Sequence, residues 1–141
     1  MNRSAITSAL LALVQETTGI VNSGLVFKAW NDQALGGMPA LILLSGKNTY
    51  VRAPNSLPPV VTLEYRVIIY QSAAGSTPGQ TLNDNMLDAL DTAMLPSPTA
   101  ELVTLGGLVN RAWAEGDVET DNGDLDGAAM LVYPIHVLVP N

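Results

Sequence analysis

The chain has 141 residues and a formal net charge of −7, with 13% charged and 48% hydrophobic residues. This length predicts one domain over residues 1–141 with a single core. The acidic balance disfavours sequence-independent binding to nucleic acid, which needs Lys and Arg to neutralise phosphates, and the absence of cysteine excludes disulfides and thiolate metal sites.

The low charge content leaves two interpretations of the surface. Average soluble proteins carry about 25% charged residues. Either uncharged polar residues and glycine cover the surface here, or part of it is buried against other subunits. We favour burial in an assembly. No apolar run reaches the length of a membrane span, so we expect no membrane partner.

The first expected element is a helix over residues 4–17. A signal peptide is the alternative, but polar residues interrupt the apolar stretch. Asn2 or Ser4 can cap the first turn, and Gly19 can end the helix. The apolar residues recur at helical spacing: Ile6, Leu10, Leu13 and Val14.

Short strands and loops are expected next. A strand is predicted over residues 25–30 and a turn at Gly36 and Gly37. Residues 39–44 form an apolar run short enough for a buried strand. Residues 46–59 have the Gly, Asn and Pro content of a mobile loop.

The clearest strand signal covers residues 60–70. Val, Leu, Tyr and Ile alternate there with a second set of residues that includes Glu64 and Arg66, which predicts a strand with two distinct faces. Residues 71–79, rich in Ser, Ala, Gly and Pro, are expected to form a second flexible loop.

A second helix is predicted over residues 81–95. Thr81 and Asp84 resemble a capping box with Asp in place of Glu, and Pro96 would end the helix. The apolar face consists of Leu82, Met86, Leu87, Leu90 and Met94. The polar face consists of Asn83, Asp84, Asp88 and Asp91.

A long acidic β-hairpin is expected to close the chain. Its arms cover residues 105–118 and 128–139, with a turn at residues 121–123, where Asn-Gly tolerates positive φ. Pro134 cannot donate to a ladder and therefore implies an edge position or a bulge. The expected order is α-β-β-β-α-β-β, an α+β fold with a mostly antiparallel twisted sheet and two helices packed on one face.

No enzyme signature is present in the sequence. His136 is the only histidine, and its place in a strand on the face of Met130 and Val132 is typical of a structural or interface residue. Residues 122–127 look like the start of a calcium loop, but Tyr133 stands where a bidentate Glu is required. We therefore predict no catalytic residue, no metal site and no cofactor.

Carboxylates are concentrated in the hairpin. Paired carboxylates can perform acid–base chemistry, but without a pocket signature we expect these to be solvated or to repel a polyanion. The group consists of Glu115, Asp117, Glu119, Asp121, Asp124 and Asp126.

The same hairpin carries a family resemblance. Residues 104–109 read Thr-Leu-Gly-Gly-Leu-Val, and an Asp-Asn-Gly-Asp turn and an apolar strand through Tyr133, Pro134 and Ile135 follow. Earlier parts agree, including Met-Pro-Ala-Leu at residues 38–41 and the second helix. The chain resembles, over nearly its whole length, the tail terminator proteins of long-tailed bacteriophages.

The resemblance implies a structural virion protein of the tail neck, assembled in the host cytoplasm. A homo-hexameric ring would cap the last ring of tail tube protein, stop tube polymerisation and join the tail to the head–tail connector protein. DNA would pass through the lumen without specific binding. The family has no catalytic residues and no cofactors.

Two groups of residues are assigned to this role as hypotheses. The acidic hairpin arm is the candidate lining of the lumen, where its charge would keep DNA from sticking. The two expected loops are candidates for the contact with the tail tube, through Lys47, Tyr50, Arg52, Ser72 and Ser76.

Other functions stay open at this point. Another head–tail connector subunit has similar size and symmetry, and a small α+β ligand-binding or regulatory domain is an alternative from a different class. Trp30, Trp113 and Tyr133 are large enough to anchor an interface, but they fit a core equally well.

Overall fold

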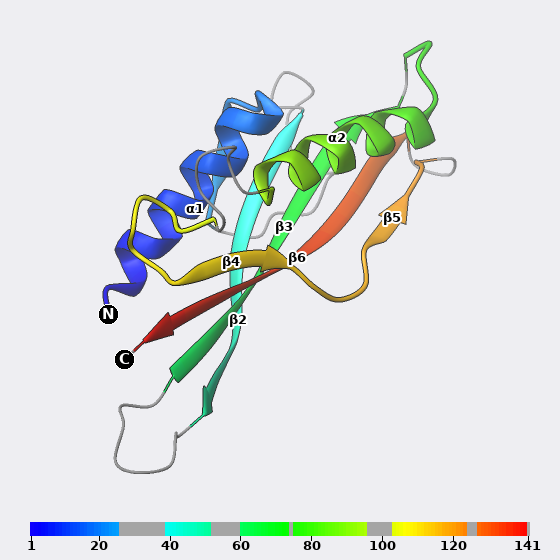
Figure 1. Ribbon diagram of the computed structural model, residues 1–141. Coiled ribbons are helices and arrows are strands. Elements are labelled where there is room, and N and C mark those ends of the chain that lie inside the picture. The colour runs from blue at the N-terminus through cyan, green and yellow to red at the C-terminus, as the bar shows by residue number, and fades with distance from the viewer. Residues whose placement is uncertain (26–38, 52–59, 74, 96–102, 124–126, 141) are drawn as a thin grey trace.

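The computed structural model describes residues 1–25, 39–51, 60–73, 75–95, 103–123 and 127–140. Its elements are α1 (Arg3–Thr18), β1 (Asn22–Gly24), β2 (Ala40–Val51), β3 (Val60–Ser72), α2 (Gly79–Ala93), β4 (Arg111–Ala114), β5 (Glu119–Asp121) and β6 (Ala128–Pro140). The strands form one six-stranded sheet in the order β1-β2-β3-β6-β4, and β5 also pairs with β6. Both helices pack on one face of the twisted sheet (Figure 1). The expected α+β class and element order are confirmed, with the penultimate strand split in two.

Helix α1 begins and ends close to the predicted residues. The Asn2 side chain accepts a hydrogen bond from the Ala5 amide at 3.0 Å, so Asn2 rather than Ser4 is the cap. Gly19 ends the helix with a φ of 73°, a conformation that glycine adopts without strain. Ile6, Leu10 and Val14 are buried beneath the helix, as their spacing predicts.

Strand β2 is longer than expected. The prediction of a loop over residues 46–59 is wrong for residues 46–51, which continue the strand and pair with the start of β3. A β-bulge between Ser45 and Asn48 accommodates one extra residue in β2. The side chains of residues 45–51 are exposed, so the strand needs no apolar alternation there and its composition resembles that of a loop. Of the strand predicted over residues 25–30, Leu25 lies in a bend and the rest lies outside the described residues, as do residues 52–59 and the turn at Gly36 and Gly37.

Strands β3 and β6 form the centre of the sheet. They pair antiparallel along their whole length, from Val60 opposite Pro140 to Ser72 opposite Ala128. The predicted alternation in β3 is confirmed. Val61, Val67 and their odd-numbered neighbours are buried under the helices, whereas the even-numbered residues face the other side of the sheet.

Helix α2 differs from the prediction at its N-terminus. It begins at Gly79, so residues 71–79 form a shorter loop than expected, and Gln71 and Ser72 belong to β3. The capping box at Thr81 and Asp84 is wrong, because the cap residue is Pro78 and no side chain caps the helix.

Asn83 is a second departure in α2, because this polar residue is only 1% exposed. Its side-chain amide donates to the Asp121 carbonyl oxygen at 3.0 Å. This hydrogen bond offsets the free-energy cost of removing the amide from water, and it connects the helix to the hairpin turn. Periodicity alone assigned Asn83 to the solvent-facing side.

The closing hairpin is confirmed with one interruption. Residues 105–110 form turns rather than a strand, so the first arm begins at Arg111. Both β4 and β5 pair antiparallel with β6, and the ladder is broken at residues 115–118. Gly116, with a φ of 114°, lies against Pro134 at this break. Pro134 therefore lies at an irregularity, as predicted, but in a central strand and not at an edge.

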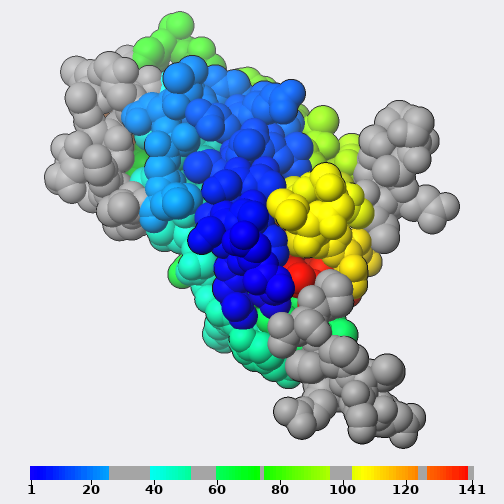
Figure 2. Space-filling view, turned by 90° about the vertical axis from the view of Figure 1, so that its left-hand side faces the viewer, coloured from blue at the N-terminus to red at the C-terminus, as the bar shows by residue number. Residues whose placement is uncertain are grey.

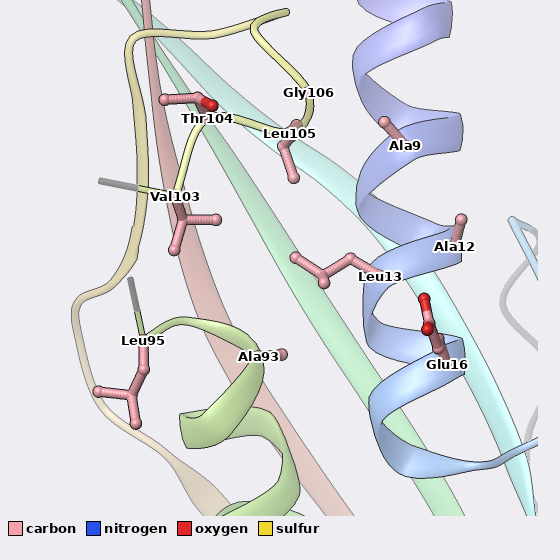
Figure 3. Close-up of a pocket in the computed structure, with 10 residues that line it drawn as sticks. All are labelled: Ala9, Ala12, Leu13, Glu16, Ala93, Leu95, Val103, Thr104, Leu105 and Gly106. Atoms are coloured by element: carbon pink, nitrogen blue, oxygen red, sulfur yellow. The ribbon is translucent and has the colours of Figure 1, made fainter. Parts of the chain in front are cut away.

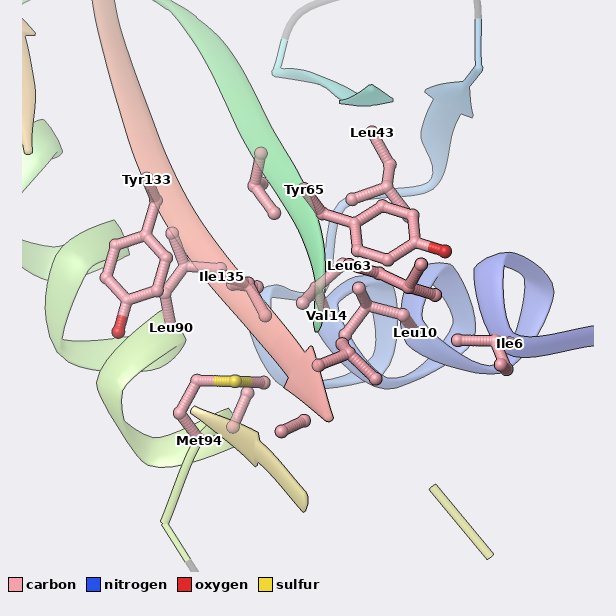
Figure 4. Packing of buried hydrophobic residues seen from close by; sticks show 14 of the residues in the cluster. Ile6, Leu10, Val14, Leu43, Leu63, Tyr65, Leu90, Met94, Tyr133 and Ile135 are labelled. Atoms are coloured by element: carbon pink, nitrogen blue, oxygen red, sulfur yellow. The ribbon is translucent and has the colours of Figure 1, made fainter. Parts of the chain in front are cut away.

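One core lies between the helices and the sheet (Figure 4). Tyr133 is 2% exposed and belongs to this core, whereas Trp113 is half-buried on the other face. Trp30 lies outside the described residues. The opposite face carries a smaller buried cluster of Ile42, Ile68 and Tyr70.

Gly79 marks the tightest approach of α2 to the hairpin turn, and its replacement is the first prediction. A Cβ at this position would lie 1.8 Å from the Asn122 carbonyl oxygen, so Gly79→Ala forces backbone atoms apart. We expect a loss of about 2–3 kcal/mol in the free energy of unfolding, measured by urea denaturation.

Gly75→Ala is the matched control, because no heavy atom lies within 4 Å of the added Cβ. We expect its unfolding free energy to stay within about 0.5 kcal/mol of the unsubstituted chain. Equal stability of the two variants would contradict the close packing of α2 on the turn.

Candidate interaction surfaces

The single histidine lies in a ladder of side chains on the face away from the helices. His136 pairs with Trp113 across β6 and β4, and their ring centroids are 5.7 Å apart. Nδ1 of His136 lies 3.7 Å from Oε2 of Glu115, and the Arg111 guanidinium carbon lies 5.1 Å from the Trp113 ring centroid. No nucleophile is placed beside the imidazole by these contacts. The arrangement suits a structural or interface role.

The acidic turn is held by hydrogen bonds within the protein. Asp121 Oδ1 accepts a hydrogen bond from the Gly123 amide at 2.8 Å. The Asp121 carbonyl oxygen is taken by Asn83. Within the described ranges, no three His, Cys, Asp or Glu side chains gather as metal ligands would. Asp124 and Asp126 lie outside those ranges.

The predicted acidic arm forms one exposed edge of the sheet. Glu115, Asp117, Glu119 and Asp121 are all exposed. Asp84, Asp88 and Asp91 on the solvent side of α2 are also exposed. The negative charge therefore extends from the hairpin edge to the neighbouring helix, a continuity that the sequence did not reveal.

The predicted contact residues lie at opposite ends of the sheet. Lys47 and Tyr50 are exposed near the end of β2, and the Tyr50 hydroxyl accepts a hydrogen bond from the Arg3 guanidinium at 2.7 Å. Ser72 and Ser76 are exposed at the other end of β3. A strand of 13 residues is about 43 Å long. Arg52 lies outside the described residues, so the structure brings the predicted set together in two pairs and not in one site.

A polar hollow of about 480 Å³ lies at the Ser76 end. It is lined by residues 73, 75–80 and 122–123, where the start of α2 meets the hairpin turn. The N-terminus of α2 has no side-chain cap there. A partner that covers this end would therefore meet backbone amides and small polar side chains.

An apolar groove of about 530 Å³ lies on the helical face and was missed by the sequence analysis. Figure 2 shows the segment of residues 103–110 (yellow) beside α1 (blue). Leu13 of α1 and Leu105 of that segment point into the space between them (Figure 3). Leu95 at the end of α2 is 64% exposed at the same groove. In the sequence, the Gly-Gly pair after Leu105 was the one indication of an unusual turn here. In the structure, Leu105 has a φ of 51°, which is unusual for a leucine.

Tyr133 makes a short side-chain hydrogen bond between the sheet and α2. Its hydroxyl donates to Asp91 Oδ1 at 2.6 Å. Burial raises the pKa of Tyr133 well above that of an ordinary tyrosine, and the hydrogen bond and negative charge of Asp91 raise it further. Burial also raises the pKa of Tyr70, on the other face of the sheet. Both hydroxyls are therefore neutral structural groups at pH 7.

Comparisons with known proteins agree on the fold alone. No family model matches the chain, and no curated protein matches it. Solved structures do match. One is described as "Virion of native gene transfer agent (GTA) particle", with a TM-score of 0.59 and 11% sequence identity over 99% of this chain and 97% of that chain. At this identity the likeness shows a shared fold over the full length of both chains. In the described ranges, no helix is long and apolar enough to cross a membrane.

The second prediction concerns Tyr133→Phe, which removes the hydrogen bond to Asp91. We expect a loss of about 1–2 kcal/mol in the free energy of unfolding at pH 7. Because the folded state raises the pKa of Tyr133, this stabilisation is fully present below about pH 10 and is lost as the pH rises through the raised pKa. The difference between the variant and the unsubstituted chain should therefore narrow above about pH 10.

Tyr50→Phe is the control for this prediction, because the Tyr50 hydroxyl also takes part in a hydrogen bond, which it accepts from Arg3, but this pair is exposed. Its effect should stay within about 0.5 kcal/mol at every pH. A difference for Tyr133→Phe that stays constant from pH 7 to above pH 10 would show that the hydroxyl does not stabilise the fold in this way.

Proposed function

We propose that this chain is a structural virion protein that forms a homo-hexameric ring at the tail neck, a tail terminator that caps the tube and joins it to the head–tail connector. The observation that carries the proposal is the full-length fold match to a chain from a virion. A match over 97% of that chain leaves little of either chain outside the shared fold. The motif resemblance over residues 104–135 points the same way.

The separation of the two exposed ends supports a role between two partners. Tyr50 projects at one end of the sheet, with Lys47 nearby at the bulge, and Ser72 and Ser76 project at the other end. One flat partner surface cannot contact both ends of the same subunit. In a ring with its strands along the channel, one end would meet the tail tube protein and the other the connector protein.

Charge supports the passage of DNA without binding. Seven exposed carboxylates lie on the hairpin edge and the adjoining side of α2. If this flank lines the lumen, its charge repels the phosphate backbone over about one Debye length, 8–10 Å at physiological salt. Cryo-electron microscopy of the particle neck with residues 115–121 on the outer rim would refute this placement.

Another neck connector subunit is the alternative, and position in the particle separates the two. A map of the neck that places the chain directly on the last tube ring supports the terminator role. Density one layer nearer the head supports the connector role. Absence of the chain from purified particles by mass spectrometry would refute both.

The third prediction separates the two ends of the subunit. Particles are assembled with Tyr50→Ser/Val51→Ser in one preparation and Ser72→Glu/Ser76→Glu in another. All four side chains are exposed, so each fold should survive. We expect one variant to leave uncapped or overlong tubes and the other to leave finished tails without heads, as counted by negative-stain microscopy.

Ser8→Glu, an exposed position in the middle of α1, is the control and should join heads to tails normally. If both end variants also join normally, these residues do not contact the tube or the connector. If both fail at the same step, the two ends do not serve different partners.

A further inference from the structure

Among the described residues, the outer edge of β2 has a paired strand along only a short part of its length. Strand β1 pairs only with Ala40, Leu41 and Ile42. In the part of the chain that the structure describes, β2 beyond Ile42 pairs on one side only, with β3. The side chains of residues 45–51 are exposed. An edge that the described residues leave in this state offers its backbone N–H and C=O groups to another strand.

The opposite edge of the sheet carries the acidic arm, and no described strand pairs with its outer side there. Val103 bridges Ala112 on the outer side of β4 and closes that position. From Ala114 to Asp121 the residues are exposed, and the described residues pair with this stretch only on the β6 side. The stretch carries four carboxylates and no basic residue.

We propose that the backbone of the β2 edge of one copy pairs with the backbone of the acidic edge of a second copy, so that the sheets of neighbouring subunits join side by side. The single Lys47 leaves most of the four carboxylate side chains uncompensated, so they can still face the lumen of the proposed ring. This inference rests on the proposed ring and names the contact that would build it. Lys47 lies at the bulge near the middle of the open β2 edge. An antiparallel register that centres the two edges places Lys47 opposite Asp117, between Glu115 and Glu119.

Charge makes each edge reject a copy of itself. Two β2 edges would bring Lys47 against Lys47, and two acidic edges would bring eight carboxylates together. Like charges directly opposite each other in a ladder are destabilising, and opposite charges are favourable. Only the mixed contact places a positive charge, that of Lys47, among the carboxylates, so the sequence favours one pairing partly by opposing the others.

Strand direction is compatible with this contact. Strands β2, β3, β6 and β4 alternate in direction across the sheet. A rotation about an axis along the strands preserves direction, so the β2 strand of the next copy lies antiparallel to β4 and β5. The two edges are different surfaces, and a contact between different surfaces repeats from copy to copy until the ring closes.

Cysteine cross-linking tests the proposal, because the chain has no cysteine of its own. Ser45→Cys places one thiol on the β2 edge, and Val118→Cys places one on the acidic edge. Both positions are exposed, and both changes leave every charged residue in place. A short bismaleimide is the reagent, because its reach tolerates a register slip of two residues, about 7 Å along a strand.

We expect an equimolar mixture of the two single variants to give several-fold more cross-linked dimer than either variant alone. The double variant should give a ladder of oligomers. Lys47→Glu in the mixture should lower the yield several-fold, and Lys47→Arg should preserve it. A mixture of Ser45→Cys with Ser8→Cys, on the exposed side of α1, controls for random collision.

The reaction is run on concentrated protein and on purified particles that carry the double variant. A mixture that cross-links no better than the Ser8→Cys control in solution, with no ladder in particles, overturns the edge contact. Homodimers formed by either single variant as efficiently as the mixed dimer overturn it as well. A ring seen in the particle neck without the ladder removes this contact and leaves the proposed function standing. If the chain gives a cross-linked ladder in solution but is absent from purified particles, the edge contact stands and the proposed function is refuted.

Discussion

The antiparallel pairing of β3 with β6 is the constraint on which the other features depend. Both strands have 13 residues and pair along their entire length. This length separates the two ends of the molecule by about 40 Å, and the alternation of side chains gives the sheet one face for the helices and one face of mixed character. The exposed ends, and the two edges that the described residues leave without a further strand, are consequences of this central pair. A shorter ladder would bring the ends together and leave a single contact surface.

The acidic edge keeps its position because α2 holds the hairpin turn. Asn83 donates to the Asp121 carbonyl oxygen, Gly79 allows the helix to approach Asn122, and Tyr133 reaches back to Asp91. These three contacts fix a stretch of like charges that would otherwise repel itself. The most negative part of the molecule is therefore attached to its core by buried or half-buried polar groups. Rigid attachment would favour the proposed contact of this edge with a neighbouring subunit.

Sequence patterns predicted the elements that bury one regular face. The spacing of Ile6, Leu10 and Val14 predicted α1, and strict alternation predicted β3, because burial on one side imposes those periods. The extension of β2 through residues 46–51 was missed because a strand exposed at its edge needs no alternation. The burial of Asn83 was missed because its partner is a backbone carbonyl 38 residues away. The groove beside α1 forms where residues 103–106 pack against the helix. These segments are far apart in the sequence, so no periodic pattern in either of them predicts how they pack.

The break in the first hairpin arm connects these observations. Opposite Pro134 the chain leaves the ladder at residues 115–118, and Gly116 takes a positive φ that bends the edge. Breaks, charges and bulges are the means by which soluble proteins keep an open edge from pairing indiscriminately. Here the bulge and Lys47 lie on one edge, and the break and the carboxylates lie on the other. The charges that disfavour the pairing of two identical edges have opposite signs on the two edges, so they favour the pairing of one edge with the other. Protection against aggregation and selection of the next subunit in a ring can therefore come from the same residues.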